Sequence, residues 1–186
     1  MKRIVLFAIV VLFAATATQA QKLITRTGHA KIYSHTVAED IEANNYSVSG
    51  TIDKTTGDVV ISVPVQSFEF EKAAMQKHFN NKHFMNSKKY PKITFKGKVT
   101  NLSAVKFTTD GTYKATVTGD LTIRAVTKSI TETATITVKD GKVSVDIVFT
   151  VKGIGSYGVG KPTSKKKENN VADDIVVTYK ASYDTK

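Results

Sequence analysis

Apolar and polar side chains alternate with a period of two residues along most of this chain. In TYKATVTGDLTIR, residues 112–124, the odd-numbered positions are apolar or small, and the positions between them are mainly threonine or charged. The segments KVSVDIVFTVK (142–152) and DIVVTYKASY (174–183) repeat the pattern. Because successive side chains of a strand point to opposite faces, the alternation indicates strands with one buried face. It favours antiparallel sheets, since the strands of a parallel sheet are buried on both faces.

The same reasoning predicts further strands, and short turn signals separate them. The turn signals are TTGD (55–58), TDG (109–111) and KDG (139–141), and threonine, valine, isoleucine and tyrosine are enriched between them. The additional strands are expected at about 29–36, 45–53, 58–65, 92–102 and 129–138.

About eight strands joined by short turns predict an all-β fold, either an antiparallel barrel or a sandwich. We favour a barrel of about eight strands, because closing the sheet removes its exposed edges. A barrel of this size encloses either packed side chains or a small ligand cavity. Several of the predicted inward positions are small, and they fit both alternatives: Ala115, Gly119, Ala134 and Ala181.

The first twenty residues have the features of a secretory signal peptide. Lys2 and Arg3 precede the apolar run IVLFAIVVLFA (4–14), and the small residues of ATATQA lead to a predicted cleavage before Gln21. An uncleaved anchor is disfavoured because a bilayer span needs about 20 apolar residues, and no later stretch qualifies as a membrane span. The expected product is one periplasmic or secreted domain over residues 21–186. The chain has no cysteine, which excludes disulfides and a lipoprotein anchor.

The predicted mature chain is basic. Without Lys2 and Arg3 it holds 25 lysines and arginines against 16 acidic residues, a net charge of +9. Such a surface attracts anionic headgroups, phosphorylated small molecules or nucleic acid, and export makes nucleic acid the least expected partner. The lysine run at 165–167 is interpreted first as a solvated loop, and second as a charge near the mouth of a barrel.

One segment, FEKAAMQKHFNNKHF, departs from the strand pattern. It predicts a short helix over 71–82, with Met75 and Phe79 on a shared face. His78 and His83 lie five residues apart, whereas zinc-binding histidine pairs on a helix are four apart, so no metal site is predicted.

Motifs for cofactors and catalysis are weak in this sequence. The glycines of GIGSYGVGKPTS (153–164) resemble phosphate-binding loops, but Pro162 and the polar residues after it do not predict the helix that such loops need. We therefore expect a flexible turn there and no cofactor. The chain contains no G-x-S-x-G elbow, and no acid pair stands at a catalytic spacing.

Glu132 is an exception to the apolar phase of its strand, SITETATITV. A buried lone carboxylate is costly unless it is paired. Three arrangements would relieve that cost: a place at a rim, a basic partner, or a bulge that shifts the register. Should the protein act on a bound molecule, Glu132 and His35 are the two side chains that we would test.

Three segments together resemble the YceI-like family of exported lipid- and polyisoprenoid-binding proteins. They are the helix region with the MNSKKYPKITF motif (70–97), VTGDLTIRAVTKSIT (117–131) and the predicted N-terminal strand pair (32–53). His78 matches the family histidine, whereas His83 does not. Ala125 replaces the usual glycine, which is tolerable if Ala125 avoids positive φ, and Glu132 replaces a usually apolar residue.

The resemblance implies a lipocalin-like barrel with an apolar tunnel that holds an isoprenoid or fatty chain, and no enzymatic activity. The alternative is a structural or interaction protein of the envelope with a filled barrel and a basic surface. The oligomeric state is not predicted. Phe79 and Phe84 are expected to cover one end of the barrel. The residues expected to line its interior are Ile93, Phe95, Tyr113, Val117, Leu121, Ile123, Val145, Ile147, Phe149, Val177 and Tyr179.

Overall fold

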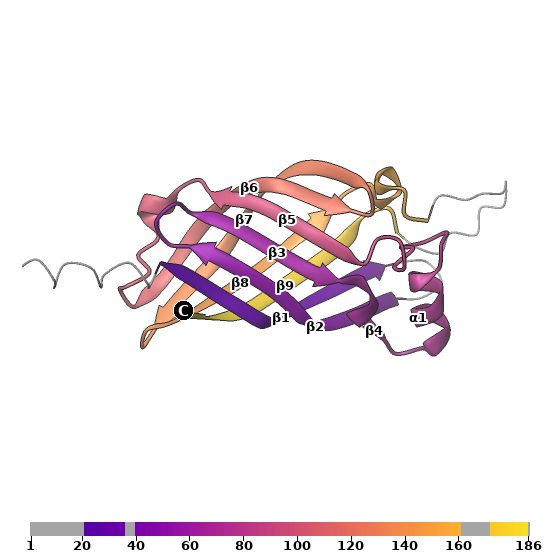
Figure 1. The fold of residues 1–186 in the computed structure, drawn as a ribbon, viewed down its shortest axis with the longest axis horizontal. Helices are drawn as coiled ribbons and strands as arrows, with labels where there is room; N and C mark the ends of the chain where they lie inside the picture. Colours follow the sequence, from indigo (N-terminus) through magenta and orange to yellow (C-terminus); the bar gives the residue numbers. More distant parts are fainter. Residues whose placement is uncertain (1–20, 36–39, 161–171, 186) are drawn as a thin grey trace, which may run out of the picture.

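The computed structural model describes residues 21–35, 40–160 and 172–185. The predicted signal peptide and the lysine run at 165–167 lie outside these ranges. Within them, the chain forms the following strands (Figure 1): β1 (Lys22–His35), β2 (Asp40–Asp53), β3 (Asp58–Pro64), β4 (Glu69–Phe70), β5 (Lys92–Val99), β6 (Gly111–Ile123), β7 (Val126–Lys139), β8 (Lys142–Val151) and β9 (Ile175–Thr185).

Eight of these strands close into one antiparallel barrel. The hydrogen-bonded order is β1-β9-β8-β7-β6-β5-β3-β2, and the pairing of β1 with β2 completes the ring. The short strand β4 is added to the edge of β2, near one end of the barrel. The predicted all-β antiparallel barrel is therefore confirmed, and so is the single short helix. Among the described residues, no helix is long and apolar enough to cross a bilayer.

The first two predicted strands, at 29–36 and 45–53, begin several residues after the observed starts of β1 and β2. Bulges interrupt the alternation of apolar and polar residues in both strands. In β1 the register against β2 shifts on both sides of Gly28, and two successive residues, Arg26 and Thr27, are exposed. In β2 the successive residues Tyr46 and Ser47 are likewise both exposed. A bulge adds one residue to a strand and reverses the faces on either side of it, so the period of two is lost in the sequence although the strand continues.

Two glycines allow β5 and β6 to approach each other closely. Gly97 and Gly119 face each other in register, and a Cβ built on Gly119 would lie 2.3 Å from the Cα of Gly97. The Phe95 ring lies over both glycines, 2.6 and 2.8 Å from the two built Cβ positions. The small inward residue at 119 thus makes room for an aromatic side chain of the neighbouring strand, not for empty space.

The helix α1 (Ala73–Asn80) lies at one end of the barrel, beside β4 (Figure 1). It is shorter than the predicted span of 71–82 because Lys72 and Asn81 both have extended backbone angles. The Asn81 side-chain oxygen then accepts hydrogen bonds from the backbone N–H groups of His83 and Phe84, which turns the chain away from the helix. Phe79 is buried and Met75 is half-buried, so the predicted inward face of the helix is correct.

Candidate ligand-binding cavity

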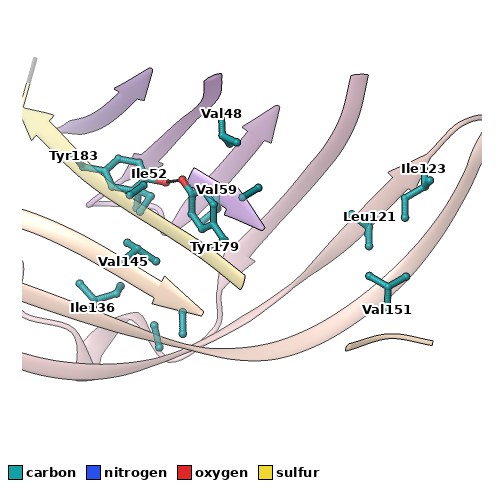
Figure 2. Close-up of a cluster of buried hydrophobic side chains, with 14 of the residues drawn as sticks. Val48, Ile52, Val59, Leu121, Ile123, Ile136, Val145, Val151, Tyr179 and Tyr183 are labelled. Atoms are coloured by element: carbon teal, nitrogen blue, oxygen red, sulfur yellow. Dashed lines mark hydrogen bonds between the residues drawn. The ribbon is translucent and has the colours of Figure 1, made fainter. Parts of the chain in front are cut away.

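The inward faces of the barrel strands enclose a cavity of about 440 Å³. Nearly all of its lining side chains are aliphatic or aromatic, and α1 contributes Met75, His78 and Phe79 at one end. Figure 2 shows part of this interior, with the Leu121, Ile123 and Val151 side chains in one group and those around Tyr179 in another. Sites for small molecules are commonly apolar cavities of about 300–1,000 Å³, so this interior has the size and chemistry of a ligand site.

Twelve of the thirteen residues nominated from the sequence line this cavity. They are Phe79, Phe84, Ile93, Phe95, Val117, Leu121, Ile123, Val145, Ile147, Phe149, Val177 and Tyr179. The strand phases therefore identified the inward face correctly on each strand that was used. That these residues hold a ligand stays a prediction.

Tyr113 differs from that expectation, because it does not line the cavity. It is near the start of β6, its hydroxyl donates to the backbone carbonyl of Thr109 at 2.8 Å, and its ring lies close to Gly111. The phase of the strand is correct for Tyr113, but the side chain packs against the turn that precedes the strand and does not reach the interior.

Several lining residues were missed by sequence reasoning. Val59, Ile61 and Val63 alternate along β3 and point inward, and Phe68 and Phe70 close the end next to α1. The alternation of the first three was visible in DVVISVP, although these residues were not nominated. Phe68 follows a 3-10 turn and Phe70 ends the two-residue strand β4, and both elements are too short for a period to mark the inward side.

Three aromatic rings pack around Phe79 at the helix end of the cavity. The Phe79 ring centroid lies 5.5 Å from that of Phe68, 4.9 Å from that of Phe70 and 5.9 Å from that of Phe84. The tilted arrangements are those that aromatic pairs prefer. Phe79 and Phe84 therefore cover this end of the barrel, as the sequence analysis expected.

The histidines of this region do not form a metal site in the described part of the chain. The His78 ring packs against Phe84 with 5.4 Å between centroids, and His83 is exposed. Residues 21–35, 40–160 and 172–185 contain no cluster of three or more histidine, aspartate or glutamate side chains that could hold a metal ion.

Two tyrosine hydroxyls form a buried pair inside the barrel. Tyr179 and Tyr183 both line the cavity, and one hydroxyl donates to the other at 2.9 Å (Figure 2). Burial raises the pKa of Tyr179 from its ordinary value of 10.0 to about 12, and burial together with the neighbouring hydroxyl raises the pKa of Tyr183 as well. The pair is therefore neutral at physiological pH and places a small polar group in an otherwise apolar wall.

This pair predicts a loss of stability at alkaline pH. In the unfolded chain Tyr179 ionises near pH 10, whereas in the folded chain it ionises near pH 12. The stabilising contribution is thus complete below pH 10 and is lost as the pH rises to about 12. Two pKa units correspond to about 3 kcal/mol, and the raised pKa of Tyr183 adds to the loss. The wild-type protein should therefore lose at least about 3 kcal/mol more free energy of unfolding between pH 9 and pH 12 than the double variant Y179F/Y183F. Urea unfolding at both pH values measures this, and equal losses in the two proteins would contradict it.

Glu132 lines the cavity from the middle of β7. The register of β6 against β7 is unbroken from Gly111 to Ile123, with Val117 opposite Glu132, so no bulge between these strands shifts its phase. His35, the other side chain considered for catalysis, lies away from the cavity lining: it is exposed at the end of β1 and pairs with Asp40 at 2.6 Å. The structure does not bring the two together.

The loop after β8 packs against the hairpin that joins β6 and β7. Gly153 begins this loop with positive φ, and residues 154–157 form a single 3-10 turn. The Arg124 guanidinium donates to the backbone carbonyl of Gly158, and the Lys128 ammonium donates to the Ser156 hydroxyl. In the described residues, the predicted glycine-rich turn thus makes defined contacts with Arg124 and Lys128.

The hairpin also explains how alanine replaces the expected glycine. Arg124, not Ala125, takes the left-handed conformation, with a φ of 56°. The Arg124 guanidinium carbon lies 5.4 Å from the centroid of the Tyr90 ring. Ala125 therefore avoids the conformation that would have required glycine.

The family assignment follows from comparison of the whole chain with known proteins. The family model described as the YceI-like domain matches residues 19–183. The chain belongs to the YceI-like family. This confirms the resemblance drawn from the three sequence segments. No curated protein sequence matches the chain.

Several solved structures share the fold of this chain at low sequence identity. A polyisoprenoid binding domain from Saccharophagus degradans, implicated in plant cell wall breakdown, has a TM-score of 0.73 at 12% identity and covers 90% of this chain and 99% of its own. BcnA from Burkholderia cenocepacia has a TM-score of 0.69 at 20% identity, with coverages of 85% and 96%. The Campylobacter jejuni YCEI protein has a TM-score of 0.60 at 22% identity, with coverages of 82% and 90%.

Proposed function

We propose that this YceI-like protein binds a long-chain apolar molecule, a polyisoprenoid or a fatty chain, inside its barrel. The observation that carries the proposal is the cavity of about 440 Å³, whose walls are almost entirely aliphatic and aromatic. Membership of the YceI-like family and the fold shared with a polyisoprenoid binding domain support it.

The energetics of such a site are favourable. Each methylene moved from water into the cavity contributes about 0.8 kcal/mol, so a chain of about twelve carbons gains on the order of 10 kcal/mol before costs. Loss of freedom of the flexible chain removes a large part of this gain. Wall residues such as Leu121, Ile147 and Phe149 would contact the ligand without directional bonds. The site would therefore select ligands by the length and width of their apolar chain.

The proposed role is that of a carrier or sequestering protein, not an enzyme. The polar lining side chains named above are Glu132 on β7, His78 on α1 and the two paired tyrosines on β9, so they come from three different elements. The predicted N-terminal leader supports a role after export, in the periplasm or outside the cell. The alternative, a structural protein with a filled barrel, is less favoured, because a filled barrel would not contain an apolar cavity of this volume.

A probe titration tests the proposal. We expect N-phenyl-1-naphthylamine, whose fluorescence rises in apolar surroundings, to bind the delipidated protein saturably at one site. Dodecan-1-ol should displace it, because both compete for the same apolar volume. A protein that neither raises the fluorescence nor binds the alcohol would overturn the proposed function.

A further inference from the structure

Glu132 places a carboxylate within an apolar section of the cavity wall. Along β7 its inward neighbours are Ile130 and Ala134, and Val117 faces it on β6. Glu132 is half-buried, and its side chain makes no hydrogen bond or ion pair with any other described residue. Folding has therefore removed part of the water around this carboxylate without supplying a partner, which is a cost to stability.

The sheet is open beside Glu132. The pairing between β7 and β8 extends only from Lys139 and Lys142 to Thr135 and Asp146, although β7 begins at Val126 and β8 continues to Val151. Most inward side chains on these unpaired parts are half-buried, with Ala134 and Val151 as the buried exceptions, whereas those on the paired parts are buried. The structure matches none of the three arrangements considered from the sequence: among the described residues Glu132 has no basic partner, no bulge between β6 and β7 shifts its phase, and it lies in the middle of β7 beside a stretch where β7 and β8 are not paired.

Among the described residues, two cations of the β6–β7 hairpin and β7 are directed elsewhere. Lys128 shares the inward phase of β7, but its ammonium donates to Ser156 and lies 4.5 Å from the centroid of the Tyr157 ring. Arg124 donates to Gly158. Both side chains hold the loop after β8, so neither neutralises the carboxylate of Glu132.

We propose that Glu132 is the head-group site for a positively charged amphiphile, a long-chain amine whose tail occupies the cavity. A carboxylate only accepts hydrogen bonds, so an ammonium, with three donors and an opposite charge, is the complementary group. A carboxylate or phosphate head is repelled at the same place. This inference rests on the proposed function, because it assigns a head group to the chain that the cavity holds.

The net charge of the protein opposes the binding of a positively charged ligand. The whole chain carries a formal charge of +11, which repels cationic ligands at long range. At physiological ionic strength this repulsion is largely screened beyond about 8 Å. A preference for an amine over an alcohol of equal length must therefore arise from a local negative group within the site.

The test is displacement of N-phenyl-1-naphthylamine by three ligands of equal chain length: dodecylamine, dodecan-1-ol and dodecanoic acid at pH 7.4. We expect dodecylamine to displace the probe at a concentration about tenfold lower than dodecan-1-ol, the size of effect given by one charge-assisted hydrogen bond. Dodecanoic acid should be the weakest. In E132Q the concentrations at which the three ligands displace the probe should agree within about twofold, and the probe should still bind.

The control is D120N, which removes an exposed carboxylate from β6 and should keep the preference for the amine. Equal displacement by amine and alcohol in the wild-type protein, a preference for the acid, or a preference that survives in E132Q would each overturn the head-group inference alone. Absence of displacement by all three ligands would overturn the proposed function together with it.

Discussion

Replacing Val117 with tryptophan is expected to weaken binding of an apolar chain at least about 100-fold. Val117 is half-buried in the middle of β6 and projects into the cavity, opposite Glu132. An indole at this position occupies the volume that the chain needs, and close-packed walls cannot move aside to restore it. The loss corresponds to about 2.7 kcal/mol of binding free energy. Titration with N-phenyl-1-naphthylamine measures it directly.

The matched control is V148W, which makes the same change on the outer face of β8. Val148 is 61% exposed, so the added indole there should leave both folding and binding unchanged. A circular dichroism spectrum and an unfolding midpoint close to those of the wild type must accompany the loss in V117W. If V117W folds and binds the probe as tightly as V148W, the chain does not occupy the barrel interior.

Replacing Phe68 with alanine is expected to destabilise the protein by about 3–5 kcal/mol. Phe68 is 2% exposed and is among the largest fully buried side chains of the described residues. Its ring packs edge-on against Phe79, so the substitution removes contacts that hold α1 to the end of the barrel. The lost hydrophobic burial and the space left behind both contribute to the cost.

Urea unfolding measures this effect as a lower midpoint with an unchanged slope. The control is V148A, which removes an exposed side chain and should cost less than about 1 kcal/mol. A loss below about 1 kcal/mol in F68A would show that the helix end of the barrel contributes little to the stability of the fold.

The architecture was predictable because alternation survives wherever strands are regular. β6 and β7 pair without interruption from Gly111 to Ile123, and the period of two identified the inward face of β6, although Tyr113 packs against a turn and does not reach the cavity. The limits of β1 and β2 were not predictable, because bulges place two exposed residues in succession there. A period of two cannot be recognised across such a shift, although the strand continues.

The presence of a cavity could not be predicted from the sequence. Small inward residues were compatible with both open space and tight packing, and the chain uses them for packing: Phe95 covers Gly119, and Ala115 and Ala134 are buried side by side. Glu132 shows the same limit. Its unusual phase was evident in the sequence, but no sequence signal marks the point at which the pairing between β7 and β8 ends, close to Glu132.

Native mass spectrometry of the protein, purified without detergent from cells that export it, tests the central claim most directly. We expect the wild-type protein to carry one apolar molecule that solvent extraction releases, and V117W to carry none. Polyisoprenoids and fatty amphiphiles are distinguished by the mass of the released molecule. A wild-type protein that is ligand-free and binds no apolar chain afterwards, or a V117W protein that carries the same molecule, would contradict the account.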